Sequence, residues 1–216
     1  MADDTRNRIL DAAEHLIARL GYQKTTVDDI AAEARISKRT IYLHFPSKEE
    51  IALVTIDRIA ERLNERLRAL SRVNGSPAAR LREMLCERVM FRFDSVHEYR
   101  GGIDESVRSL RPGLLARRAC HFDAEARILA EVLAEGRATS EFTGGDDVAT
   151  AHAMILATNA LLPASLSPSE LEERTEIEAW ALRIIDLLLG GVLAKGLART
   201  ARRFLDGTRR RAALPS

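Results

Sequence analysis

The chain has 216 residues, a hydrophobic fraction of 46% and a formal net charge of +1 at pH 7. This length allows one or two domains with an ample core, and the balanced charge excludes a global basic field, so any attraction to nucleic acid must be local. The charged start MADDTRNR differs from a signal peptide and no apolar run approaches the roughly 20 residues that span a bilayer, so a cytoplasmic protein is expected.

The first predicted element is an amphipathic helix over residues 5–20. Its apolar residues recur at helical spacing, and Gly21 ends the pattern. We expect this helix to cover two shorter helices that follow it, so that the three share one small core. The residues expected in that core are Leu10, Leu16, Ile17, Leu20, Val27, Ile30, Ile41 and Phe45.

Residues 27–34 are predicted to form the second helix. Their apolar side chains share one face at the i, i+3, i+4, i+7 spacing. Thr26, followed three residues later by Asp29, is a typical N-cap signal. A short helix that begins directly after Thr26 is therefore expected.

A third helix is predicted over residues 38–45, with Ser37 as its N-cap. Pro46 stops this helix because proline lacks an N–H. Ser47 and Glu50 then have the spacing of a capping box, which predicts the start of a longer helix. Two short helices joined by a tight turn form a helix-turn-helix layout.

The side chains of this third helix fit the reading of DNA. A recognition helix places its N-terminal side chains at base edges, while neighbouring donors hold phosphates. Arg39 suits a bidentate contact with guanine, and Thr40 can offer a hydroxyl or a methyl group. The alternative is a short helical pair with a solvated basic face. The residues predicted to contact DNA are Thr26, Ser37, Lys38, Arg39, Thr40, Tyr42, His44 and Lys48.

Residues 25–50, TTVDDIAAEARISKRTIYLHFPSKEE, resemble the DNA-binding domain of the TetR/AcrR family of bacterial transcriptional regulators. The resemblance is specific over residues 5–59 and only architectural beyond them. The chain departs from the family at Arg35, in a turn that usually holds glycine, and at Arg39, where a small residue is frequent. If the turn needs a left-handed residue, Arg35 costs about 1–2 kcal/mol. Arg39 predicts a different operator sequence.

The rest of the chain is predicted to be helical almost throughout, without strand-like alternation. We therefore expect an all-α protein with an N-terminal three-helix helix-turn-helix DNA-binding domain (residues 1–48). A helical bundle for ligand binding and dimerisation (residues 49–194) and a basic C-terminal tail (residues 195–216) would follow. The segments expected in the bundle cover residues 48–73, 77–98, 103–110, 114–135, 148–162 and 168–193, with a break at Pro112-Gly113.

A homodimer is expected, because one helix-turn-helix buries too little surface to select a genomic site and such proteins read two half-sites about 34 Å apart. The resemblance implies that the last two long helices of each subunit pair with those of the other. These residues could instead be ordinary core, which has a similar composition. The residues predicted at the interface are Ile155, Leu162, Ile177, Trp180, Ile184, Leu188 and Val192.

The resemblance also implies a ligand cavity in the bundle and an unknown small-molecule effector. Mixed apolar and polar side chains indicate its lining, although a core or surface position is the alternative for each. The predicted lining residues are Met90, Phe93, His97, Tyr99, Phe122, His152 and Asn159, with Arg108 or Arg118 as anchors for an acidic ligand. Ligand and operator would then compete through one equilibrium, and residues 48–73 would link their sites.

Two rival functions remain open. Asp94-x-x-His97 has the acid–histidine spacing of metal-binding bundles, but no second copy is apparent, so no metal, cofactor or catalytic residue is assigned. A protein-interaction bundle with a non-functional DNA domain is the other rival, and Arg35 is the feature that favours it. The basic run over residues 195–211 could hold phosphates, although such runs are more often solvated.

Overall fold

The computed structural model describes residues 2–98, 103–162 and 173–193. Over these residues the chain forms eight α-helices and one short 3₁₀ helix. The pairing between Phe142 and Leu193 is an isolated bridge, and no strand occurs in the described ranges. The predicted all-α class is therefore confirmed. The predicted basic tail, residues 195–216, lies outside the described residues.

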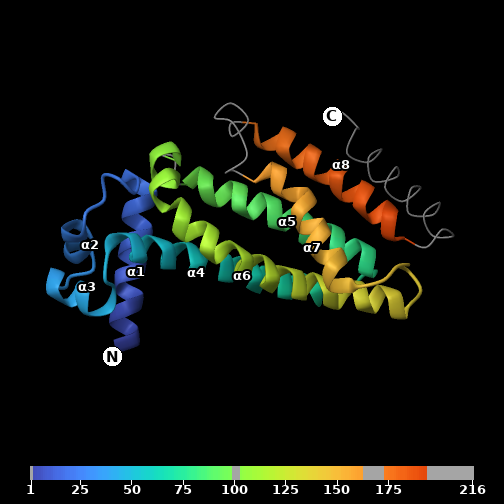
Figure 1. The fold of residues 1–216 in the computed structure, drawn as a ribbon, viewed down its shortest axis with the longest axis horizontal. Coiled ribbons are helices and arrows are strands. Elements are labelled where there is room, and N and C mark those ends of the chain that lie inside the picture. Colours follow the sequence, from blue (N-terminus) through green and yellow to red (C-terminus); the bar gives the residue numbers. More distant parts are fainter. Residues whose placement is uncertain (1, 99–102, 163–172, 194–216) are drawn as a thin grey trace, which may run out of the picture.

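Three helices pack into a small unit at one end of the molecule, which we call the head (Figure 1). All eight residues predicted for its core belong to one apolar cluster, in which Ile17, Leu20 and Val27 are only partly buried. Ile51 of the following helix is fully buried in the same cluster. The head helices are α1 (Ala2–Leu20), α2 (Val27–Glu33) and α3 (Lys38–His44).

The caps predicted for the two short helices are confirmed. Thr26 and Asp29 form a capping box, in which each side chain accepts a hydrogen bond from the backbone N–H of the other residue. At α3, the Ser37 hydroxyl accepts from the N–H of Thr40 at 3.0 Å. These bonds satisfy N–H groups that have no partner inside the helix, so they fix where each helix begins.

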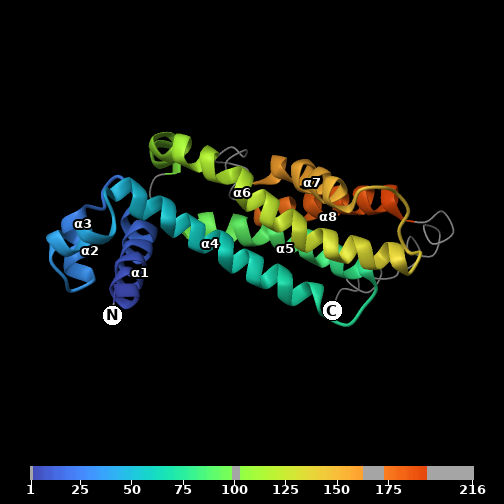
Figure 2. The same ribbon diagram turned by 60° about the horizontal axis from the view of Figure 1, so that its bottom comes forward.

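The connector α4 (Lys48–Ser71) starts in the head and runs along the whole body in Figure 2. Ser47 caps it by accepting from the N–H of Glu50 at 3.1 Å. The capping box predicted here is only half formed, because the Glu50 carboxylate binds Arg117 of α6 instead. An ion pair with another helix has replaced the local bond.

The other helices form a bundle, which we call the body. Its core takes a fully buried residue from each packed helix, namely Leu63, Leu81, Leu129, Ile155 and Ile185. The body helices are α5 (Pro77–Glu98), α6 (Ile103–Ala138), α7 (Asp147–Thr158), the 3₁₀ helix η1 (Asn159–Leu161) and α8 (Arg174–Val192).

The break predicted at Pro112-Gly113 is wrong, because α6 continues through both residues. A proline inside a helix costs about 3 kcal/mol, and tertiary packing offsets this loss. Leu110 is buried against α4, and the missing side chain at Gly113 lets Leu53 approach closely. A Cβ at position 113 would lie 2.5 Å from Cδ1 of Leu53. The same cluster includes Tyr22 of the head, so α6 packs where head and connector meet.

Candidate functional site

The third helix of the head turns one face to the core and the other to solvent. Ile41 is fully buried, whereas Tyr42 and Leu43 are 49% and 76% exposed. Arg39 precedes Leu43 by four residues, so both lie on the outward face. In Figure 1, α3 lies at the outer end of the head, away from the body. A long partner can therefore approach this helix unobstructed.

The two cations at the start of α3 have different surroundings. The Lys38 ammonium binds the Asp28 carboxylate of α2 at 2.8 Å, and this hydrogen bond raises the pKa of Lys38. Arg39 is exposed and makes no hydrogen bond or ion pair with any residue that the structure describes. An arginine with its donors unused suits a base edge or a phosphate.

The hydroxyl groups predicted to contact DNA also serve local structure. Thr26 and Ser37 are the caps of α2 and α3, and the Ser37 and Thr40 hydroxyl oxygens lie 2.8 Å apart. Tyr42 is exposed, and His44 is half-buried in the last turn of α3. The predicted contact residues from 37 to 44 thus all belong to one short helix and its N-cap.

Lys48 is largely occupied inside the chain. Its Nζ donates to the backbone carbonyls of Tyr22 and Thr25, at 3.0 Å each, and lies 4.3 Å from the centre of the Tyr22 ring. Burial lowers the pKa of this ammonium. Lys48 fastens the loop after α1 to the start of α4, which leaves at most one of its three N–H donors for a phosphate.

The turn between α2 and α3 holds Arg35 in the left-handed conformation, with φ of +54°. The N–H of Arg35 binds the carbonyl of Ala32 at 3.1 Å, and the N–H of Ile36 binds that of Ala31 at 3.0 Å. These paired bonds are those of a Schellman motif. The turn therefore has its ordinary shape, and Arg35 is strained in it.

Leu43 was missed by the sequence reasoning, although it is the most exposed large apolar residue of α3. The signal was its position, which lies off the face shared by Ile41 and Phe45. An apolar side chain on an outward helix face can contact a thymine methyl group in the major groove.

The segment that contains the head matches the model of a family described as bacterial regulatory proteins, tetR family, over residues 9–55. Residues 9–55, which cover most of the head and the start of α4, are thus similar to the regulatory proteins of this family. It is 38% identical over 69 residues to the HTH-type transcriptional regulator EthR of Mycobacterium tuberculosis. That match covers 32% of the chain and spans 32% of the length of EthR.

Solved TetR-family structures share the fold over nearly the whole chain. A transcriptional regulator from Mesorhizobium loti has a TM-score of 0.68 and 18% identity, and the alignment covers 90% of this chain and 99% of that one. SmeT, the repressor of the Stenotrophomonas maltophilia multidrug efflux pump SmeDEF, has a TM-score of 0.62 and 21% identity, with coverages of 89% and 92%. At these identities the likeness concerns the fold.

In this TetR-family fold, α4 is tied to α1 of the head. Arg58 of α4 binds Asp11 at 2.7 Å, and Arg62 of α4 forms a two-pronged pair with Glu14. Paired guanidinium and carboxylate groups fix orientation as well as distance. The head should therefore follow α4 when that helix moves.

The body also holds the start of α4, through side chains of α6. Arg117 binds both carboxylate oxygens of Glu50, at 2.9 and 2.8 Å, and also pairs with Asp57. The other oxygen of Asp57 lies 2.9 Å from Nε2 of His121. Because Glu50 is in the first turn of α4, a shift of α6 reaches the segment that follows α3 directly.

The residues predicted to line a ligand cavity fall into separate places. Met90 and Phe93 are buried in the core of the body, and His152 pairs with Asp123 at 3.2 Å. Phe122 and Asn159 both contact Arg88, a residue that the sequence reasoning missed. The side chains of His97, Tyr99 and Arg108 lie outside the described residues.

Arg88 could have been found from the sequence, because it shares the helix face of Leu81 and Leu85, which are buried. A charged residue within an apolar stripe needs a buried partner. That partner is Glu125, which is 1% exposed and lies 2.6 Å from Nε of Arg88.

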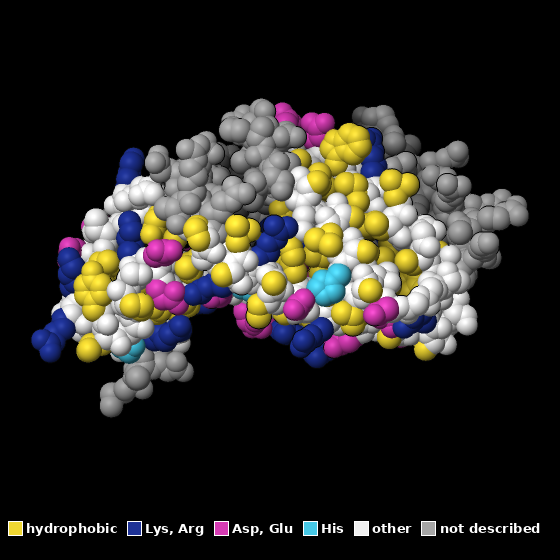
Figure 3. All heavy atoms as spheres, viewed as in Figure 1, with side chains coloured by type: hydrophobic (Ala, Val, Ile, Leu, Met, Phe, Trp, Pro, Cys, Tyr) yellow, Lys and Arg dark blue, Asp and Glu magenta, His cyan; other side chains and the backbone are white. Residues whose placement is uncertain are grey.

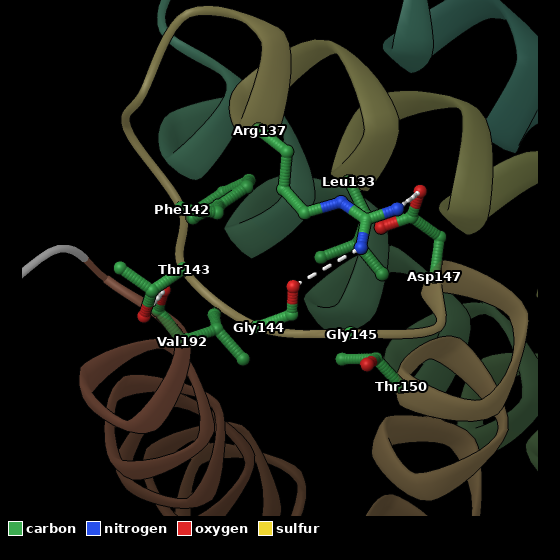
Figure 4. A pocket seen from close by; sticks show the side chains of 9 residues that line it. All are labelled: Leu133, Arg137, Phe142, Thr143, Gly144, Gly145, Asp147, Thr150 and Val192. Carbon is green, nitrogen blue, oxygen red and sulfur yellow. Dashed lines mark hydrogen bonds and ion pairs between the residues drawn. The ribbon is translucent and has the colours of Figure 1, made fainter.

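A small pocket lies between the last turns of α6, the loop that follows it, the start of α7 and the end of α8 (Figure 4). Arg137 crosses it, donates to the carbonyl of Gly144 at 3.2 Å and pairs with Asp147. The pocket has a volume of about 10 Å³, which is enough for about one water molecule. This pocket is too small for an effector.

The predicted interface residues differ in exposure. Ile155 and Ile177 are buried in the core of the body, whereas Trp180 is 46% exposed. The exposed residues Leu156 and Leu187, at 61% and 78%, were missed. Figure 3 shows apolar side chains gathered over α7 and α8. The partly buried residues predicted at this face are Leu162, Ile184, Leu188 and Val192.

Asp94, which has acid–histidine spacing with His97, is engaged with Arg174, which donates to its two oxygens at 2.8 and 3.0 Å. Among the described side chains, no three His, Cys, Asp or Glu residues gather in a metal-binding arrangement. In the same ranges, no helix has the length and apolar character needed to cross a membrane.

Proposed function

We propose that the chain is a sequence-specific DNA-binding transcriptional regulator that binds a pseudo-palindromic operator as a homodimer and represses until an effector binds. The observation that carries this proposal is the outward face of α3, where Arg39 has no partner in the described part of the chain. The caps and the core around that helix are in place. SmeT, which shares the fold, is a repressor.

The proposed reading face combines two kinds of contact. Lys38, Arg39 and Thr40 would meet base edges in the major groove, and Leu43 adds an apolar contact. Lys48 acts mainly by holding the loop after α1. The residues proposed beside phosphates are Thr26, Ser37, Tyr42 and His44.

The proposed dimer interface is the exposed apolar face of α7 and α8. Leu156, Trp180 and Leu187 are large apolar side chains in solvent, which a second copy of the chain would cover. Among the described residues, Gly190 and Gly191 have no neighbour within 4 Å of an added Cβ, which would let another backbone approach them closely. Two heads joined in this way would read two half-sites.

The proposed switch acts through α4. Ion pairs join this helix to α1 on one side and to α6 on the other, so a ligand that moves α6 changes the distance between the two heads. DNA and effector then favour different arrangements of the same dimer. We propose no catalytic role, since the family consists of regulators. We place the protein in the cytoplasm, where the operator lies.

A gel-shift titration on the DNA that flanks the gene tests the proposal. We expect a specific complex at moderate salt, and a variant that carries Lys38→Ala and Arg39→Ala should lose sequence preference while its dimer mass stays unchanged. Absence of any specific complex would refute the regulator, whereas preference that survives the double substitution would refute only the reading face.

A further inference from the structure

A buried polar cluster lies between α5, α6 and the end of α7. Arg88 is fully buried, and each of its three guanidinium nitrogens donates a hydrogen bond. Nε donates to Glu125 at 2.6 Å, Nη1 to the Thr158 hydroxyl at 2.9 Å and Nη2 to the Asn159 side-chain oxygen at 2.8 Å. Such a network holds α5, α6 and the end of α7 in one arrangement.

Positive charge exceeds negative charge in this cluster. Arg92 binds the second oxygen of Glu125, so two guanidinium groups share one carboxylate. The guanidinium of Arg118 lies 4.8 Å from the centre of the Phe122 ring and has no ion pair with any described residue. Arg88 and Arg92 lie 5.3 and 5.9 Å from the same ring. Among the described residues, three cations thus surround one ring beside a single anion.

Two buried donors in the cluster lack an acceptor. Nδ2 of Asn159 and Nε of Arg92 have no hydrogen-bond partner among the described residues. A buried donor without a partner is unfavourable, because it has lost its hydrogen bonds to water without replacing them. Burial lowers the pKa of Arg88, and the charges of Arg92 and Arg118 act in the same direction, against Glu125. Spare donors and surplus positive charge among the described residues together favour the binding of an anion.

We propose that this cluster is the effector site and that its ligand is a small organic carboxylate held by Arg92, Arg118 and Asn159 against Phe122. One carboxylate supplies two acceptor oxygens and one negative charge, which offsets part of the positive charge of the three guanidinium groups. Arg88 keeps its ion pair with Glu125 when the ligand is bound. Arg92 and Arg118 are the more exposed members, so the ligand enters on their side.

The regulatory role of this site rests on the proposed function, although carboxylate binding itself does not. Arg118 and Phe122 follow directly after Arg117 and His121 in α6. Arg117 and His121 hold Glu50 and Asp57 of α4. A ligand that draws Arg118 and Phe122 inward would therefore move the groups that fix the start of α4.

Isothermal titration of the purified full chain, without DNA, tests the site with acetate, octanoate, benzoate and inorganic phosphate. We expect saturable binding of at least one of the carboxylates. Arg118→Gln and Arg92→Gln should each weaken it about tenfold, because each removes a charge-assisted hydrogen bond. Arg66→Gln is the matched control, since Arg66 also stacks on a phenylalanine, at 4.7 Å, and pairs with a glutamate at 2.8 Å, but outside the cluster.

Binding of phosphate alone, no saturable binding, or binding that both cluster variants keep would overturn the proposal. If Arg92→Gln fails to fold by circular dichroism, Arg118→Gln decides the matter, because Arg118 is exposed. A chain that binds a carboxylate but no specific DNA keeps this site and refutes the regulator. If the chain binds specific DNA but none of the carboxylates, the proposed regulator stands and the carboxylate site is refuted.

Discussion

The head and the body use their arginines in opposite ways. Arg39 of the head is exposed and has no partner in the described part of the chain. Arg88 of the body is fully buried and has three partners. Both are single cations on helices of one chain, so the difference lies entirely in their surroundings.

The surroundings of each arginine determine which property of the protein it controls. A solvated cation contributes little to folding and keeps its charge for a ligand. A buried cation must be compensated, so its partners determine whether the body folds at all. Substitution of Arg39 should therefore change DNA binding at nearly constant stability, whereas substitution of Glu125, the buried partner of Arg88, should mainly change stability.

The largest expected effect is the loss of the buried anion. Glu125→Leu leaves Arg88 and Arg92 without a counter-charge, which should lower the free energy of unfolding by about 3–5 kcal/mol. Urea denaturation measures this change. In the control Glu87→Leu, the lost partner is Arg66, whose side chain is 60% exposed, so the change should stay below about 1 kcal/mol. Equal losses in the two variants would mean that burial does not separate the two kinds of arginine.

The next effect concerns the head. Arg39→Ala should weaken specific DNA binding by about 1–3 kcal/mol, while the free energy of unfolding changes by less than about 0.5 kcal/mol. Fluorescence anisotropy on specific and random duplexes measures both affinities. If affinity falls equally for both duplexes, Arg39 contacts phosphate and reads no base.

The local structure of the head could be predicted because neighbours in sequence determine it. Thr26 and Ser37 cap the next helix with their own side chains, and the apolar spacing gives the buried face. Glu50 shows the limit of such reasoning. The local capping rule was half right, because an arginine 67 residues away binds its carboxylate.

The body could be predicted as a helical bundle, but its polar groups could not be placed. The rule that proline ends a helix failed at Pro112, because packing of Leu110 against α4 outweighs one lost bond. Met90 and Phe93 fill the core, while Arg88 and Glu125 meet although they lie 37 residues apart. Pairings over such distances depend on how the helices pack, which a single sequence does not state.

A smaller effect tests whether the head carries strain independent of its charges. Arg35→Gly should raise the free energy of unfolding by about 1 kcal/mol, because glycine adopts the left-handed turn freely. Thermal unfolding measures the gain. Ser140→Gly is a matched control, because Ser140 also has a positive φ, +59°, but lies in the body. It measures the effect of placing glycine at a left-handed position outside the head. A destabilised Arg35→Gly variant would show that the arginine side chain supports the turn.

The smallest expected effect is the acid sensitivity of the cap on α2. The Thr26 hydroxyl, followed by the Thr26 backbone N–H, lowers the pKa of the Asp29 carboxyl. A carboxyl with a lower pKa in the folded state adds stability above its unfolded pKa of about 4, and this stability is lost as the pH falls through the folded value. On acidification, the α2 amides of the parent chain should lose protection against hydrogen exchange. In the Asp29→Asn variant this loss should be smaller. Because Asp29 is fully exposed, the difference should be confined to α2 and absent from the buried cluster around Arg88. Identical acid profiles for both chains would show that the cap bonds do not depend on the charge of Asp29.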